Sequence, residues 1–542
     1  MKRISYILSI LIFSSLMMSS CDGFLNVDSE RYTYEEDYRL SSKHDSLYSM
    51  VGILSQLQLL GDRYVLLGEL RGDLMYATDN ASRFLKEIND FSISNDNPYN
   101  STKEYYAVIN NCNYTIQYVD TALAVKGTKP MYKVMAAAKA IRAWTYLQLV
   151  LNYGTCKYIV DPILTAEDAE KDYPSYNVNE LAEVLVQDLL PYADIDYLDL
   201  GNFASVDSKK ALIPVKMILG DLYLWKGDYQ NAAAAYYSLI YDESRLINPQ
   251  YNGTRAFLND VPTGSLSSSW INVFSVNCIE TISFLVSSPD YGHAFTLDTL
   301  SLHFDIAGTK KVVNDWQNAL YYENNNAITK GDMRIYGSLT MNTYFSTLNE
   351  SLLKGDSTTV DKYLFFGNET EKSIIIYRNS LLYLRYAEAV NRMGFPNLAF
   401  AVLKSGLKPT TVRTGKVAAE LTNAFGTAAA IPAYMTFTDF RFTTNTGTRM
   451  RGLGKLDLDS TYYIIQNLPT KEDSILYVED KIVEELEAEL AFEGNRFQDL
   501  VRVATRRNDP AYLADKVSQK YKNTDLMKAK LMDTRNWFLP GK

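Results

Sequence analysis

The chain has 542 residues, of which 47% are hydrophobic and 22% are charged. This length and composition predict a globular protein with a large hydrophobic core. The net charge is −10 and no run of basic residues occurs, so the sequence argues against nucleic acid and anionic lipid surfaces as partners. No segment beyond the first twenty residues is apolar for long enough to predict a membrane-spanning helix.

The first residues have the order of a secretory signal that ends at a cysteine. Lys2 and Arg3 form a basic start, an apolar stretch covers residues 4–18, and two serines precede Cys21. The apolar stretch is shorter than the roughly 20 residues of a bilayer span, which favours a cleaved signal peptide over a transmembrane helix. A cysteine at the cleavage point would be acylated, and acyl chains hold a protein on a membrane.

We therefore predict a lipoprotein signal peptide over residues 1–20 and a lipid anchor at Cys21. Residues 21–45 are polar and have no clear period, so we expect them to form a tether between the membrane and the folded body. The alternative is an ordinary signal peptide followed by an incidental cysteine.

Residues 46–245 carry helical periodicity over most of their length. Apolar and small side chains recur at three- and four-residue spacing, and alanine-rich stretches favour helix. The pattern predicts helices over residues 133–153, 179–190, 209–225 and 229–241. Gly154 stands where a C-cap of the first helix is expected.

Two predicted helical hairpins share one arrangement of residues around a glycine turn. The first turns at Gly227 and the second at Gly394. Identical offsets from these glycines place a small residue, an acid and an alanine in both hairpins: Gly220, Asp221 and Ala232 in the first, Ala387, Glu388 and Ala399 in the second. Small residues let antiparallel helices pack closely, so both segments resemble the tetratricopeptide type of hairpin.

Helical periodicity fades in two long regions, over residues 246–375 and 405–475. Asn, Ser, Thr, Gly and Pro become frequent there, and residues 279–286 have the pattern of a short strand. Long loops on a helical scaffold commonly carry binding function, so we expect these regions to hold the ligand.

Sequence motifs of catalytic and metal sites are absent. Only three histidines occur, and the chain has no HExxH, CxxC or GxSxG pattern. We therefore predict no catalytic residue, no metal site and no cofactor. Beyond Cys21 the cysteines are Cys112, Cys156 and Cys278, an odd number without metal-ligand spacing, and we expect buried free thiols at Cys112 and Cys156.

Tyrosine is unusually frequent, with 41 residues against 22 Phe and 5 Trp. A ring with an apolar face and a polar tip can stack on a sugar or peptide ligand. Among the aromatic and amide side chains in non-helical settings, we select Tyr76, Asn80, Trp270 and Trp316 as candidate ligand-binding residues. The alternative for each of them is ordinary packing within the fold.

Residues 483–502 read VEELEAELAFEGNRFQDLVR and combine an apolar stripe with alternating charges. Glu489, Glu493 and Arg496 lie three or four residues apart, which predicts that they share one face of a helix, and Asp499 and Arg502 continue the alternation. We interpret the segment as a helix with intramolecular ion pairs, each worth roughly a few tenths of a kcal/mol if exposed, rather than as a catalytic group.

The end of this segment, ELAFEGNRFQDLVR, resembles the C-terminal signature of the SusD/RagB family of nutrient-binding outer-membrane lipoproteins. Further pieces agree with that family in the same order: CDGFLNV at 21–27, AAKAIRAW at 137–144 with NYG at 152–154, LRYAEA at 384–389 and NWFLP at 536–540. The chain departs from the family at 486–488, where Leu, Glu and Ala stand in place of the usual basic residues.

The resemblance implies a mainly α-helical fold, in which tetratricopeptide-like hairpins frame an irregular ligand-binding region with a few short strands. Residues 46–542 would form a single domain of this type. Its helical scaffold would cover about 46–245, 376–404 and 476–542, and its loop-rich regions the remainder.

The resemblance also implies a surface lipoprotein of the outer membrane that acts as a lid on a SusC-like TonB-dependent transporter. Family ligands are mainly glycans, with peptides in some members, so we predict a non-catalytic protein that captures an oligosaccharide. The alternatives are a peptide-capturing lid of the same type, a surface glycoside hydrolase, and a helical-repeat scaffold without a small ligand.

Overall fold

The computed structural model describes residues 43–203, 206–251, 256–258, 261–263, 270–287, 295–323, 326–341, 358–364, 372–453 and 462–541. The predicted signal peptide, Cys21 and nearly all of the predicted tether lie outside the described residues.

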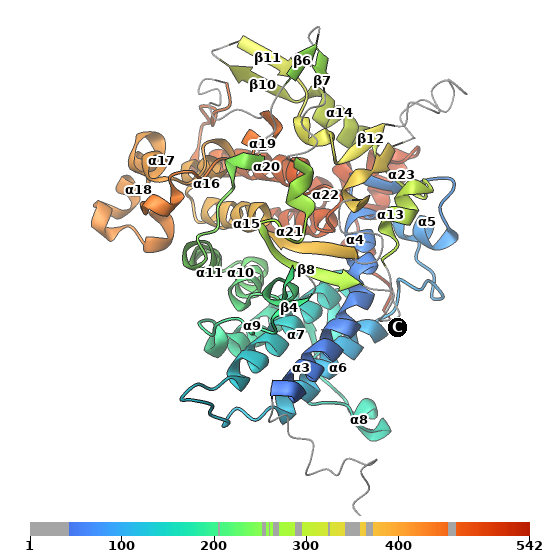
Figure 1. Ribbon diagram of the computed structural model, residues 1–542. Coiled ribbons are helices and arrows are strands. Elements are labelled where there is room, and N and C mark those ends of the chain that lie inside the picture. The colour runs from blue at the N-terminus through green and yellow to red at the C-terminus, as the bar shows by residue number, and fades with distance from the viewer. Residues whose placement is uncertain are drawn as a thin grey trace, which may run out of the picture.

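Helices make up most of the body, which confirms the mainly α-helical class (Figure 1). The longer helices of the first half are α3 (Lys43–Leu57), α4 (Gly61–Glu69), α6 (Lys103–Tyr118), α7 (Met131–Tyr153), α9 (Val178–Leu189), α10 (Val215–Lys226) and α11 (Tyr229–Asp242). Those of the second half are α15 (Asn379–Arg392), α16 (Pro396–Lys404), α18 (Gly415–Phe425), α20 (Lys471–Leu490), α21 (Arg496–Arg507), α22 (Pro510–Ser518) and α23 (Thr524–Leu531). Consecutive helices pack side by side from α6 through α7, α9, α10 and α11 to α15 and α20.

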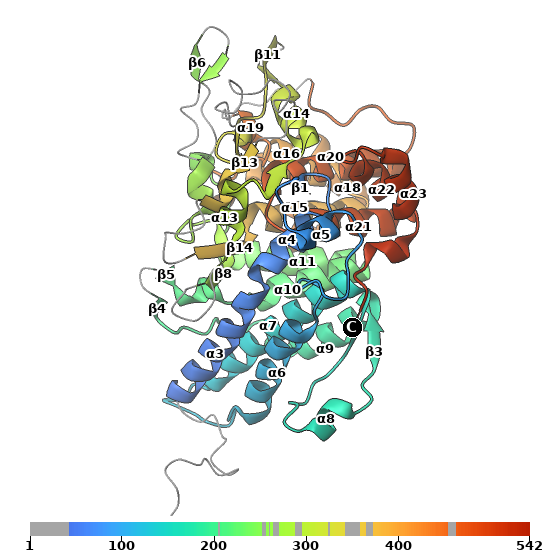
Figure 2. The same ribbon diagram turned by 90° about the vertical axis from the view of Figure 1, so that its right-hand side faces the viewer.

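Figures 1 and 2 show three tiers in this body. Helices α3, α6, α7 and α9 lie at the lower end, and α15, α20 and α21 lie across the middle. Above the middle tier lie the irregular elements: α14 (Lys310–Asn318), α19 (Met450–Leu453) and the hairpins β6–β7 (Ala256–Leu258, Val261–Thr263) and β10–β11 (Leu320–Glu323, Asn326–Lys330). The loop-rich chain therefore covers one end of a helical scaffold.

The strands are short and pair two by two. The longest pair is antiparallel and joins β8 (Thr281–Ser287) to β14 (Lys372–Arg378) with a shift in register. β8 confirms the strand predicted near residues 279–286. β1 (Met75–Ala77) pairs with β9 (Ile306–Gly308), and β12 (Leu339–Met341) pairs with β13 (Thr358–Val360). The pairs β8–β14 and β1–β9 join chain segments that lie far apart in the sequence.

Both predicted glycine hairpins are present, as α10–α11 and α15–α16. Gly227 and Gly394 have φ values of 84° and 93°, a left-handed conformation that glycine adopts without a steric penalty. A Cβ atom at Gly220 would lie 2.3 Å from the ring of Tyr236, so the small residue on α10 is required for close packing against α11.

Two helix predictions were wrong in extent, and one region predicted to be loop-rich contains helices. The helix predicted from residue 209 begins only at Val215, because Pro214 lacks an N–H group and restricts the residue before it. The region over 405–475 is less irregular than predicted, since it contains α17 (Pro409–Arg413) and α18. The third error concerns residues 483–502, which form two helices instead of one.

A tight turn over residues 491–495 separates α20 from α21. Phe492 and Gly494 have φ values of 72° and 90°, and the Gly494 N–H donates to Oε1 of Glu69 at 2.7 Å. A Cβ atom at Gly68 would lie 1.9 Å from the Gly494 carbonyl oxygen, so α4 and the turn are in direct backbone contact. The prediction that Glu489, Glu493 and Arg496 share one helical face is therefore wrong, because the turn redirects the chain between them.

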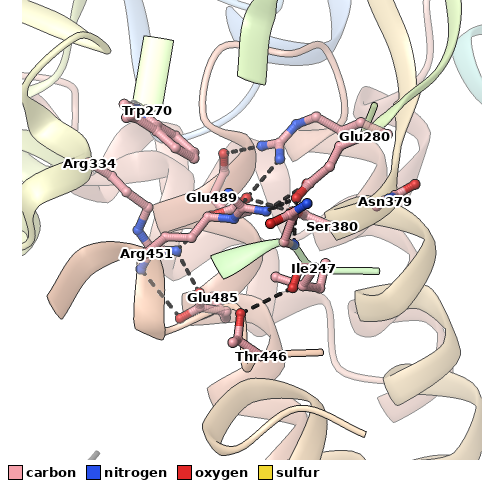
Figure 3. Close-up of polar contacts among 12 residues, drawn as sticks. Ile247, Trp270, Glu280, Arg334, Asn379, Ser380, Thr446, Arg451, Glu485 and Glu489 are labelled. Atoms are coloured by element: carbon pink, nitrogen blue, oxygen red, sulfur yellow. Dashed lines mark hydrogen bonds and ion pairs between the residues drawn. The ribbon is translucent and has the colours of Figure 1, made fainter. Parts of the chain in front are cut away.

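The carboxylate of Glu489, at the end of α20, is fully buried among arginines from separate elements (Figure 3). It accepts hydrogen bonds from Arg378 at 2.7 Å and Arg334 at 3.0 Å, and Nε of Arg451 lies 3.1 Å away. The hydroxyl of Ser380 donates to it at 2.6 Å. These ion pairs are intramolecular, as the sequence was interpreted, but they connect different elements and do not lie along one helix, and they are buried.

Neighbouring acids extend this cluster of buried charges. Arg334 donates to Glu485 at 2.5 Å, and Nη2 of Arg451 donates to both carboxylate oxygens of Glu280 at 2.6 Å. Glu493 accepts from Arg378 at 2.8 Å and from Lys362 at 2.7 Å. Burial by itself raises the pKa of Glu489, but the charges of Arg378, Arg451 and Arg334 outweigh it and hold this pKa well below its usual range.

Replacing Glu489 with glutamine should destabilise the fold. The isosteric Glu489→Gln variant leaves three buried arginines without their shared carboxylate, and breaking a buried ion pair in this way costs about 3–5 kcal/mol. We expect urea denaturation to give that loss in the free energy of unfolding. The matched control is Glu472→Gln, an exposed acid at the start of the same helix, which should change stability by less than about 0.5 kcal/mol.

The loss should depend on pH in one direction. A carboxylate whose pKa is depressed in the folded state stabilises the fold above the unfolded-state value of about 4.3, and this contribution fades as the pH falls below it. The stability difference between the wild type and Glu489→Gln should therefore be full at pH 7 and should shrink below about pH 4. A difference that is absent at pH 7 would contradict the role given to this carboxylate.

Candidate functional site

A shallow cleft of about 430 Å³ opens at the start of the loop-rich region. This volume lies within the range of roughly 300–1,000 Å³ that small-molecule sites occupy. Its walls are the end of η5 (Pro249–Tyr251) and the turn that leads from η6 (Asn272–Phe274) into β8. The described residues of its lining have uncharged polar side chains: Gln250, Tyr251, Asn272, Ser275, Asn277 and Cys278.

Buried aromatic residues beneath one wall of the cleft position its side chains. Val273 and Phe274 are fully buried, and the ring of Phe274 packs edge-on against Trp270 with 5.0 Å between the ring centroids. Because these neighbours point into the core, Asn272 is left at the surface. The polar wall of the cleft therefore lies on the surface above the buried rings of Trp270 and Phe274, which hold it in place.

Hydrogen bonds fix the turn over residues 275–278. The carbonyl of Ser275 accepts from the Cys278 N–H at 2.9 Å and from the Thr281 hydroxyl at 2.9 Å. Nζ of Lys210, in η4 (Ser208–Ala211) of the helical scaffold, donates to the carbonyls of Val276 at 3.0 Å and Cys278 at 2.8 Å. The scaffold therefore holds this wall of the cleft from behind.

The amide side chains of the cleft are directed to solvent. Gln250, Asn272 and Asn277 are exposed. Within the described part of the chain, the structure gives no hydrogen bond for the side-chain amides of Asn272 and Asn277. Each amide group offers donors and an acceptor at once, which matches the hydroxyl groups of a sugar or the backbone of a peptide.

Both titratable groups of the lining are neutral at physiological pH. Burial raises the pKa of Tyr251 to about 12 and also raises the pKa of the Cys278 thiol. No carboxylate is among the described residues that line the cleft. The arrangement can donate and accept hydrogen bonds, but these residues do not form a general acid and base pair.

A second cavity, of about 470 Å³, lies in the helical scaffold between α7, α10 and α11. Charged side chains at its edge pair with each other: Lys216 lies 3.2 Å from Asp194 and 2.6 Å from Asp242, and Lys133 lies 3.3 Å from Asp196. Since these charges already have partners, we place the candidate site at the cleft with unpaired amides.

Trp270 and Trp316 are buried, each with 2% of its surface exposed. The indole N–H of Trp270 donates to Ser338 at 3.0 Å, and the ring of Trp316 packs edge-on against Phe492. Neither ring offers a free face to a ligand, and both are packed as the alternative interpretation of the sequence described. A binding role for either ring stays a prediction that would require this packing to open.

Tyr76 and Asn80 lie elsewhere on the surface. Tyr76 is half-buried on β1, opposite Ala307 of β9, and Asn80 is exposed in the following turn, where its N–H donates to the Thr78 hydroxyl. The structure brings neither of them to the cleft, and their binding role likewise stays a prediction. Cys112, Cys156 and Cys278 are buried free thiols, which confirms the expectation for the first two.

The residues that line the cleft were missed by sequence reasoning, although they fall within the region over 246–375 that was expected to hold the ligand. The available signal was the cluster of Asn and Ser residues that directly follows Trp270. Because η5 joins the cleft from twenty residues earlier, the pocket itself could not be read from one stretch of sequence.

Two features are absent from the described residues. None of the helices there has the length and apolar character needed to cross a membrane. Likewise, these residues contain no group of three or more His, Cys, Asp or Glu side chains arranged to hold a metal ion.

Comparison by sequence finds no match, whereas comparison with solved structures shows which fold the chain has. No protein-family model matches the chain, and no curated protein matches it. A SusD superfamily protein from Bacteroides thetaiotaomicron is similar in structure with a TM-score of 0.56 at 15% identity, over 93% of this chain and 96% of that one.

Two further solved structures extend the similarity. A SusD superfamily protein from Bacteroides vulgatus gives a TM-score of 0.57 at 13% identity, covering 90% of this chain and 92% of its own. Surface glycan-binding protein A from Bacteroides uniformis gives 0.52 at 14% identity, covering 87% and 90%. The agreement extends over nearly the full length of each protein, and the chain therefore has the fold of the SusD superfamily proteins, as the sequence motifs predicted.

Proposed function

We propose that the protein is a non-catalytic binding protein of the cell surface that captures oligosaccharides and delivers them to a SusC-like TonB-dependent transporter. The observation that carries this proposal is the shared fold with a surface glycan-binding protein over 87% of the chain. The cleft adds a chemical reason, because its free amides match the hydroxyl groups of a sugar. Ile279, which is 66% exposed directly after Cys278, offers an apolar surface for the C–H face of a sugar ring.

The chemistry of the cleft favours binding over hydrolysis. Most glycoside hydrolases act with a pair of carboxyl groups that flank the scissile bond. The described lining of the cleft supplies amides, hydroxyls and a thiol instead. Peptide capture is the second candidate, since the same amides can bind a peptide backbone. Calorimetry with glycans and with peptides separates the two ligands.

Attachment to the outer membrane would come from Cys21. The basic start and short apolar stretch before this residue support a lipoprotein signal, and an acylated cysteine would keep the helical body at the membrane. In this arrangement the helical hairpins would face the transporter, and the irregular tier would hold the ligand.

Removing the free amides of the cleft should weaken glycan binding. Each net hydrogen bond contributes about 1 kcal/mol, so Asn272→Ala and Asn277→Ala should each raise the dissociation constant about fivefold. Calorimetry of the detergent-solubilised full-length protein with glycan and peptide panels would measure this. The control is Asn179→Ala, an exposed amide on α9 away from the cleft, which should bind as the wild type does. Binding of peptides alone, or release of hydrolysis products, would contradict the proposal.

The anchor and the transporter can be tested in cells. Cys21→Ala should abolish labelling by a palmitate analogue and should release the protein from the outer-membrane fraction, because the acylated thiol is lost. The wild-type protein should co-purify with a large TonB-dependent barrel after mild detergent extraction. Retention of the variant in the membrane, or purification of the wild type alone, would count against this part of the proposal.

A further inference from the structure

The described lining of the cleft carries no formal charge. Its amides, hydroxyls and thiol are neutral at physiological pH, and burial keeps Tyr251 and Cys278 protonated. An uncharged ligand can replace the water on these groups with direct hydrogen bonds. An anionic ligand would lose part of its hydration without gaining a cation from the lining, which is unfavourable.

Two ionisable groups adjoin the described walls of the cleft, and both are held by contacts within the protein. Glu280, two residues after Cys278, is fully buried and accepts from Arg451 at 2.6 Å. Lys210 directs its ammonium group at the carbonyls of Val276 and Cys278, behind the wall of the cleft. Neither Arg451 nor Lys210 is among the side chains that line the cleft, so neither presents its charge to a ligand there.

The overall charge of the protein also disfavours anionic ligands. The net charge of −10 gives the protein a negative potential on average, which disfavours the approach of anionic ligands. A cleft built to bind uronates or sulfated sugars would need local cations to overcome this field, in the way that arginine and lysine do in anion sites. The described lining of this cleft supplies amides, hydroxyls and a thiol in their place.

We propose that this cleft selects neutral glycans and discriminates against glycans that carry carboxylate or sulfate groups. The inference rests on the proposed function, since it names the substrate class of the same site. Selectivity arises from the absence of a cationic partner in the described lining, while the amides bind the hydroxyl groups that neutral and acidic sugars share.

Matched pairs of oligosaccharides test the selectivity. The full-length protein in detergent would be titrated with neutral galactan, glucan and mannan oligosaccharides, and with galacturonan, glucuronan and mannuronan oligosaccharides of equal length. At low salt, we expect at least one neutral oligosaccharide to have a dissociation constant at least about tenfold lower than that of its acidic counterpart. Acidic members that bind as tightly as their neutral counterparts would overturn the inference and leave glycan capture standing. Failure of every glycan to bind would overturn the proposed function as well.

A gain-of-function variant tests whether the lining of the cleft sets the selectivity. Asn277→Arg places a guanidinium at its edge and should tighten the binding of the acidic oligosaccharides, so that the ratio of acidic to neutral affinity rises at least about fivefold. Asn179→Arg makes the same change of overall charge on α9 and should leave that ratio close to the wild-type value. An equal change in both variants would mean that net charge, and not the lining of the cleft, sets the preference, and would overturn the assignment.

Discussion

The architecture depends on one buried carboxylate at the end of α20. Glu489 is fully buried and is contacted by Arg334, Arg378 and Arg451, which come from η8 (Met333–Ile335), β14 and α19. Apolar packing alone gives little directional information to loops, whereas a buried cation that lacks its partner is strongly unfavourable. The carboxylate therefore fixes which loops meet and where they meet, and the hydrophobic core fills the space around that arrangement.

The two glycine hairpins extend the same principle through the helical scaffold. Asp221 on α10 pairs with Arg385 on α15 at 2.5 Å, and Glu388, at the equivalent position of the second hairpin, pairs with Arg502 on α21 at 2.6 Å. The repeated offset from the turn glycine thus places an acid that binds an arginine of a neighbouring helix. Buried pairs of this kind contribute little net stability but penalise alternative packings, so we infer that they set the order in which the hairpins stack.

The sequence predicted those features of the fold that depend on local patterns of residues. The spacing of apolar and small residues predicted α7, α9 and α11, and the turn glycines predicted both hairpins. The break after Leu490 was missed because the charge pattern continues through it. The contacts that hold the turn come from distant residues, since Gly68 of α4 lies against the backbone of Gly494 and Glu69 accepts from its N–H. Trp270 and Trp316 illustrate the same limit: a large ring beside polar residues suits a surface or a core equally well until its neighbours are known.

The candidate site is a consequence of how the charges are paired. Glu280 and Arg451 bind each other within the cluster around Glu489, and Lys210 is held by backbone carbonyls, so none of these three ionic groups is among the described residues that line the cleft. What remains at the surface of that segment is a set of amides and hydroxyls on a rigid support. The neutral, hydrogen-bonding cleft and the heavily charged interior therefore result from the same arrangement of charges. The cations that could have bound an acidic ligand already connect the irregular tier to the scaffold.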